Sequence, residues 1–129
     1  MRSKKIKTIR IAIDATAGSG STSLALKLAK HYRLRYCDTG KIYRWCAFQI
    51  MKKKPKNNIK FLKKNIKNLN LKELQSKKLI DDKVAQVTSE ISSDTRLRKL
   101  VFNFQRKIAY NIPRGYAGSV LNGRDITHN

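Results

Sequence analysis

The sequence has few cysteines and no long hydrophobic segment. Its two cysteines are Cys37 and Cys46, too few for a disulfide framework or a zinc site, so we expect buried thiols in a reducing compartment. No apolar run approaches the ~20 residues needed to cross a bilayer. The basic N-terminus is not followed by the apolar stretch and cleavage site of a secretory signal. We therefore expect a cytoplasmic protein with no membrane partner and no metal site built from protein side chains alone.

Acidic residues are scarce as well. The chain has 30 lysines and arginines against 8 aspartates and glutamates, a formal net charge of +22. Such a charge attracts phosphate-bearing partners, from nucleic acids to small nucleotides. Much of it lies in lysine- and asparagine-rich tracts (52–54, 60–67 and 72–78) that lack the interleaved aromatic residues of a base-stacking surface. We favour a solvated surface, and keep a nucleic-acid-binding surface as the alternative.

Apolar spacing predicts strands that alternate with helices. Isoleucine at every second position predicts a buried strand over 8–14, and the residues that follow predict a helix over 22–32 and a short strand over 34–37. Further helices are expected from Thr39, over 59–69, over 83–92 and after an N-cap at Ser93–Asp94, before a strand over 119–122 that follows a loop containing Gly118. With 129 residues, this order predicts one α/β domain with a parallel sheet and flanking helices.

The segment between the first strand and the first helix has the composition of a phosphate-binding loop. Small residues leave backbone N–H groups converging at the positive end of a helix, where anions bind. The phosphate-loop pattern G-x-x-x-x-G-K-[ST] has Ala15 here in place of its first glycine and Ser21 in place of its lysine. An ordinary strand–helix turn is equally compatible with this segment alone. Its residues are Ala15, Thr16, Ala17, Gly18, Ser19, Gly20, Ser21, Thr22 and Ser23.

Two further motifs follow predicted strands. Asp38-Thr39-Gly40-Lys41-Ile42-Tyr43-Arg44 comes after the second strand, and Gly123-Arg124-Asp125 after the third. The carboxyl ends of parallel strands form the edge at which such sheets bind ligands. We therefore expect a phosphate-bearing ligand at this edge.

These motifs, with the stretch from Val84 to Arg106 and Asn122 before the Gly-Arg-Asp element, resemble those of the bacterial cytidylate kinases, which are P-loop nucleoside monophosphate kinases. The resemblance implies transfer of the γ-phosphoryl group of ATP to CMP or dCMP, in pyrimidine nucleotide metabolism. It implies that the 15–23 loop holds the ATP phosphates and that Thr22 or Ser23 offers a hydroxyl to Mg²⁺. It also implies a CMP-binding set in which two arginines hold the phosphate and three residues surround the cytosine: Arg44 and Arg124, and Ser89, Arg98 and Asp125.

The resemblance also sets the expected domain organisation. Residues 1–129 would form one incomplete kinase-like domain, truncated after the third core strand, with 55–110 as the helical insertion that binds the acceptor nucleotide. A complete chain of this kind is expected to be a monomer. Two alternatives to an active kinase stay open, an inactive nucleotide-binding fragment and a basic RNA-binding module on a P-loop scaffold. The choice between CMP and dCMP stays open too.

Overall fold

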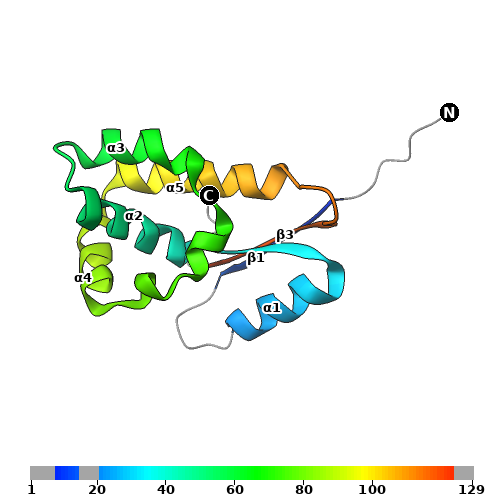
Figure 1. Ribbon diagram of the computed structural model, residues 1–129. Helices are drawn as coiled ribbons and strands as arrows, with labels where there is room; N and C mark the ends of the chain where they lie inside the picture. Colours follow the sequence, from blue (N-terminus) through cyan, green and yellow to red (C-terminus); the bar gives the residue numbers. More distant parts are fainter. Residues whose placement is uncertain (1–7, 15–20, 124–129) are drawn as a thin grey trace. The chain divides into compact units, whose positions relative to one another are not determined.

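The computed structural model describes residues 8–14 and 21–123 of the chain (Figure 1). Its contacts divide the chain into two compact units. We call Met1–Cys37 together with Ile108–Asn129 the sheet unit, and Asp38–Lys107 the helical unit. The domain boundaries expected from the sequence, with an insertion over 55–110, stay a prediction.

A three-stranded parallel sheet forms the sheet unit, as the α/β prediction requires. Its strands are β1 (Ile9–Asp14), β2 (Leu34–Asp38) and β3 (Gly118–Gly123), in the order β1-β3-β2. The last strand of the sequence is therefore central, and β1 and β3 run parallel from the pair Ile9–Gly118 to the pair Asp14–Gly123. Being central and covered, β3 is buried from Gly118 through Asn122.

Helix α1 (Ser21–Tyr32) covers one face of this sheet. Its buried residues Ala25 and Ala29 pack with Leu34 and Val120, and the isoleucines of β1 pack against this cluster. Alanine allows the helix backbone to lie close to the sheet. The predicted helix over 22–32 and the predicted strands over 8–14 and 34–37 are thus confirmed to within a residue or two.

Gly118 occupies a position in β3 that only glycine can fill. A Cβ atom built there would lie 1.8 Å from the carbonyl oxygen of Ile9 on the neighbouring strand. The sequence-based assignment of Gly118 to a loop was wrong, because this close strand approach is a tertiary feature. The third strand therefore runs from Gly118 to Gly123, longer than the predicted 119–122.

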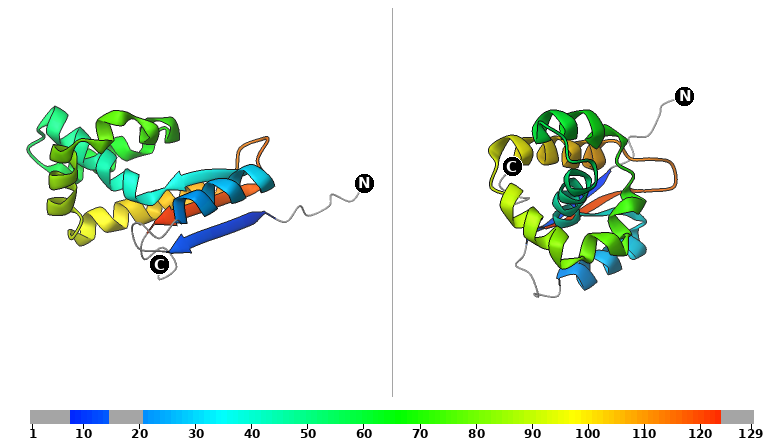
Figure 2. Two further views of the ribbon diagram at one scale, coloured as in Figure 1. Left: turned by 90° about the horizontal axis from the view of Figure 1, so that it is seen from below. Right: turned by 60° about the vertical axis from the view of Figure 1, so that its left-hand side comes forward.

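The helical unit consists of four α-helices and three short 3₁₀ helices in its described residues. Helix α2 packs against α4 and against η2 and η3, and Figure 2 shows these elements from two further sides. The last turn of α5 is counted with the sheet unit. The elements are α2 (Thr39–Lys53), α3 (Asn58–Asn65), η1 (Ile66–Asn68), η2 (Leu71–Gln75), η3 (Lys77–Ile80), α4 (Asp82–Ile91) and α5 (Thr95–Tyr110).

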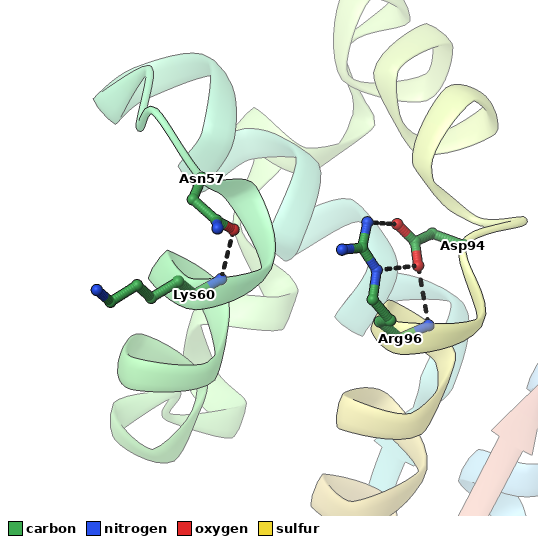
Figure 3. A network of polar contacts seen from close by, with 4 residues as sticks. All are labelled: Asn57, Lys60, Asp94 and Arg96. Atoms are coloured by element: carbon green, nitrogen blue, oxygen red, sulfur yellow. Dashed lines mark hydrogen bonds and ion pairs between the residues drawn. The ribbon is translucent and has the colours of Figure 1, made fainter.

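Side-chain caps begin the α-helices of this unit. Asn57 accepts a hydrogen bond from the Lys60 backbone N–H (3.0 Å), and Asp94 accepts one from that of Arg96 (2.8 Å; Figure 3). Asp38 and Asp81 cap α2 and α4 in the same way. The predicted cap before α5 is confirmed at Asp94. Several of the few acidic residues of the chain therefore serve as helix N-caps.

The predicted helix over 59–69 was wrong in its second half. Helix α3 ends at Asn65, whose side chain donates to the Phe61 carbonyl (2.7 Å). A 3₁₀ turn follows, and Leu69 is already extended. The asparagine side chain competes with the helix for backbone partners, which apolar spacing alone does not register. The structure also places η2 and η3 where the sequence predicted no element.

Among the described residues, none of the helices has both the length and the apolar character needed to cross a membrane. The same part of the chain contains no cluster of histidine, cysteine and acidic side chains suited to a metal ion. Its two cysteines are buried thiols, as expected.

Burial of Cys46 makes the stability of the chain pH-dependent in the alkaline range. Desolvation raises the pKa of its thiol from 9.0 to about 12. The unfolded thiol therefore ionises first, so the stabilising term is fully present below pH 9.0 and is lost as the pH rises toward 12. Between pH 8 and 11 we expect the native chain to lose roughly 2–3 kcal/mol more than Cys46→Ala in guanidinium unfolding. Equal losses in the two proteins would contradict this.

Candidate functional site

The carboxyl ends of β1 and β3 lie side by side in the sheet unit. Asp14 pairs with Gly123 at the last position of the ladder. The predicted phosphate-binding loop follows the first of these strand ends, and the Gly-Arg-Asp element follows the second. Residues 15–20, Arg124 and Asp125 lie outside the described residues. The two motifs therefore leave the sheet from neighbouring positions on one edge, the edge at which parallel sheets bind ligands.

Helix α1 begins at Ser21, seven residues downstream of Asp14 in the sequence. The free N–H groups of its first turn are the positive end of the helix dipole. No acidic side chain lies in that turn, so nothing on the helix itself neutralises it. Ser23, a candidate for the metal-binding hydroxyl, is exposed there. This turn can accept an anion such as a phosphate.

Asn122 anchors the end of β3 from which the Gly-Arg-Asp element departs. Its side chain is almost fully buried, and its Nδ2 donates to the Tyr36 hydroxyl of β2 (3.4 Å). A buried amide needs such partners to offset its lost hydration. Asn122 thus joins two strands of the sheet directly before Arg124 and Asp125.

Arg44 projects from α2 in the helical unit and is half-buried. Its Nη1 donates to the backbone carbonyl of Leu79 in η3 (2.9 Å). This bond uses one of the five N–H donors that a guanidinium carries. With its other N–H groups, an arginine can donate two hydrogen bonds to the oxygens of one phosphate.

Ser89 and Arg98 lie on the two helices that follow. Ser89 is exposed on α4, and its hydroxyl donates to the Ala85 carbonyl one turn earlier (3.2 Å). Arg98 is exposed in the first turns of α5. The contacts described for this unit join none of Arg44, Ser89 and Arg98 to another. Their roles in binding cytosine and phosphate therefore stay predictions.

Arg96 has a structural role at the start of α5. It forms an ion pair with Asp94 (Nη2 to Oδ2, 2.8 Å) on an exposed part of the helical unit (Figure 3). The pKa of Asp94 is lowered, first by the hydrogen bond from the Arg96 side chain. Arg106 lies 5.9 Å from the Phe102 ring centre on its own helix. Neither observation points to a ligand.

Sequence reasoning missed Trp45, which follows Arg44 in the sequence, and its partner Glu73. The Trp45 indole donates from Nε1 to Oε2 of Glu73 (2.8 Å), which joins α2 to η2. A signal was present, because Asn70 and Glu73 have the three-residue spacing of a capping box. Nothing in the sequence indicated that the same glutamate would also bind the indole.

The chain has a P-loop NTPase-like α/β fold, in which a parallel sheet with flanking helices leads from its first strand through a segment with Gly18 and Gly20 into a helix. The family model described as cytidylate kinase matches residues 11–129. The chain therefore belongs to the cytidylate kinase family.

The curated relatives support this family assignment. A cytidylate kinase of Bartonella tribocorum is 37% identical in an alignment of 127 residues that covers 94% of this chain and 55% of the relative. One of Rhodospirillum rubrum is 33% identical in an alignment of 117 residues that covers 90% of this chain and 55% of the relative. One of Fusobacterium nucleatum is 32% identical in an alignment of 134 residues, gaps included, that covers 92% of this chain and 57% of the relative. The chain thus spans about half the length of the curated relatives it matches.

Proposed function

We propose that the chain takes part in ATP-dependent phosphorylation of CMP or dCMP in the cytoplasm. The observation that carries this proposal is the family match over residues 11–129. The neighbouring ends of β1 and β3 in the sheet unit support it as well. The 15–23 loop follows one of these ends and the Gly-Arg-Asp element follows the other, and the resemblance implies that both bind phosphate. Phosphoryl transfer depends mainly on positioning and on neutralising charge, which suits a chain rich in arginine and lysine.

The proposed roles divide between the two units. In the sheet unit, the 15–23 loop with the first turn of α1 holds the ATP phosphates, and the Gly-Arg-Asp element contributes Arg124 and Asp125 to the acceptor. In the helical unit, Arg44 holds the acceptor phosphate, and Ser89 and Arg98 bind its base. Exposure of Ser89 and Arg98 leaves their polar groups accessible to a ligand.

Mg²⁺ is the cofactor that we expect to bind together with ATP. The ion usually keeps several waters and binds phosphate oxygens with only one or two protein oxygens. The exposed hydroxyl of Ser23 offers one such oxygen in the first turn of α1, and Thr22 is the other candidate. When bound, Mg²⁺ neutralises charge on the phosphates.

Ser21 in place of the loop lysine predicts slow turnover. Backbone amides still bind phosphate, but the moving phosphoryl group has one cation less beside it. Lys27 is the next lysine on α1, about 9 Å further along the helix axis at 1.5 Å per residue. Lys41 is the other candidate in the sequence, at the start of α2. No contact among the described residues gives either lysine this role. The variant Ser21→Lys tests the effect of the missing charge directly.

The proposal is tested by measuring CMP-dependent ADP release from Mg·ATP. We expect turnover with CMP or dCMP that exceeds turnover with UMP and AMP. Binding of CMP and ATP without ADP release would instead identify the chain as an inactive nucleotide-binding fragment. Absence of both binding and turnover contradicts the proposal for this chain.

RNA binding is a second candidate, favoured by the charge of α3. Between Asp38 and Glu73 the sequence has no acidic residue, and Lys60, Lys63 and Lys64 of α3 are exposed. If this surface binds single-stranded RNA, replacing the three lysines with glutamate is expected to reduce the slope of log K against log salt by about 2, at about 0.7 per lost phosphate contact. The same triple change at Lys77, Lys78 and Lys83 is the control. Equal slopes in all proteins contradict RNA binding through α3.

A further inference from the structure

Two successive residues of α2 anchor one segment, residues 71–80, which comprises η2, Ser76 and η3. Trp45 donates from Nε1 to Oε2 of Glu73 (2.8 Å) near the start of the segment. Arg44 donates from Nη1 to the Leu79 carbonyl (2.9 Å) near its end. Trp45 is only 5% exposed, so its indole N–H has little access to water and depends on Glu73, which is itself exposed, for a partner. The two bonds attach both ends of the 71–80 segment to α2.

Glu73 is held at both of its carboxylate oxygens. While Oε2 accepts from Trp45, Oε1 accepts from the Asn70 backbone N–H (3.3 Å). Asn70 in turn accepts from the Lys72 backbone N–H (3.0 Å), which completes a capping box at the start of η2. A single carboxylate therefore both starts the 3₁₀ helix and attaches it to α2.

External bonds matter to the 71–80 segment because its two 3₁₀ helices are short. Short 3₁₀ helices have poor hydrogen-bond geometry, and carbonyls in their last turn have no partner within the helix. The Leu79 carbonyl lies in the last turn of η3 and accepts from Arg44. Buried Leu74 and Leu79 hold the segment by apolar contact as well. The position of the Leu79 carbonyl thus depends on how the 71–80 segment is attached to α2. The orientation of the Arg44 guanidinium depends in turn on that carbonyl.

We propose that Trp45 and Glu73 are positioning residues for Arg44. They hold the 71–80 segment on α2, so that the Leu79 carbonyl restrains the Arg44 guanidinium before a nucleotide binds. An arginine restrained in advance loses less conformational entropy on binding a phosphate, which increases affinity. This inference rests on the proposed function, in which Arg44 binds the phosphate of CMP.

The test compares CMP affinities by calorimetry in Trp45→Phe, Glu73→Ala and Glu73→Gln. Each of the first two is expected to weaken CMP binding by about 3- to 10-fold, the range expected from releasing one ordered side chain. Glu73→Gln keeps an oxygen for the indole but loses the bond to Asn70, so we expect an intermediate effect. Cytidine, which has no phosphate, is expected to bind all variants equally well.

Asn57→Ala is the matched control. It removes another helix cap of the same unit, the bond to the Lys60 N–H (3.0 Å), whose partner lies on α3 and not on α2 or the 71–80 segment. We expect lower thermal stability in this variant but a CMP affinity within about twofold of the unmodified chain. A loss equal to that in Glu73→Ala would mean that general destabilisation, not positioning, lowers the affinity.

Hydrogen exchange tests the structural half of the proposal in the free protein. The Ser76 and Leu79 amides, bonded to the Glu73 and Ser76 carbonyls, are expected to exchange at least about 3-fold faster in Glu73→Ala than in Asn57→Ala. If Glu73→Ala leaves the exchange rates unchanged, or leaves the CMP affinity unchanged in a chain that binds CMP, the positioning role is contradicted while the proposed function is not. Absence of CMP binding by the unmodified chain contradicts the proposed function and this inference together.

Discussion

Ser21→Lys is expected to raise CMP-dependent ADP release by about 10- to 100-fold. The change restores the lysine of the phosphate-loop pattern, which neutralises charge on the phosphoryl group as it moves. Loss of one preorganised donor to a transition state lowers kcat by about 10²–10³, so regaining one should have an effect of similar direction and somewhat smaller size. Steady-state kinetics with Mg·ATP and CMP measure the result, and the gain should appear in kcat.

Leu26→Lys is the matched control for Ser21→Lys. Leu26 lies on the same helix, α1, and its side chain is 50% exposed, so the change adds an equal charge with little effect on packing. If net charge alone attracted ATP, both variants would gain activity, and the gain would fall with added salt. No gain from Ser21→Lys would show that the missing lysine does not limit the rate.

Arg44→Ala is expected to weaken CMP binding by about 10- to 100-fold. Hydrogen bonds to charged groups contribute about 1.5–3 kcal/mol, and a guanidinium can make two of them to one phosphate. The loss should depend on the phosphate, so cytidine affinity is expected to stay the same. Calorimetric titrations with CMP and with cytidine measure the two affinities. The variant should also melt earlier, because the Leu79 carbonyl loses its partner.

Arg96→Ala is the control for Arg44→Ala. It removes an arginine from the same unit, but one whose guanidinium is paired with Asp94 on an exposed surface. Its CMP affinity is expected to lie within about twofold of that of the unmodified chain. Equal losses in the two variants would mean that CMP responds to overall charge. A loss of cytidine binding in Arg44→Ala would mean that this arginine supports the fold of the base-binding region.

Local sequence was a sufficient guide to the elements whose signals lie within a few residues. Alternating isoleucines predicted β1, helical spacing predicted α1, α2 and α5, and an aspartate predicted the start of α5. These predictions succeeded because strand periodicity and helix capping are set by residues two to four positions apart. Segment 71–80 escaped prediction because 3₁₀ helices leave no comparable period.

The candidate site was predictable in its motifs and not in its contacts. The phosphate-binding segment was found from its small residues next to a strand, and β1 and α1 flank it as expected. Its internal residues, like Arg124 and Asp125, lie outside the described residues, so those assignments stay predictions. The Trp45–Glu73 bond was not predictable, since it joins residues 28 positions apart through packing of η2 on α2.

The sequence by itself determined the strands and most of the α-helices, where several of these helices begin, and which kinase family the motifs resemble. Tertiary structure alone decided that β3, the last strand in the chain, lies between β1 and β2, and that Gly118 must be a glycine to lie against Ile9. It also decided that Arg44 is bound to a carbonyl 35 residues away. Periodicity reports only which face of an element is apolar, whereas these features depend on which elements pack together.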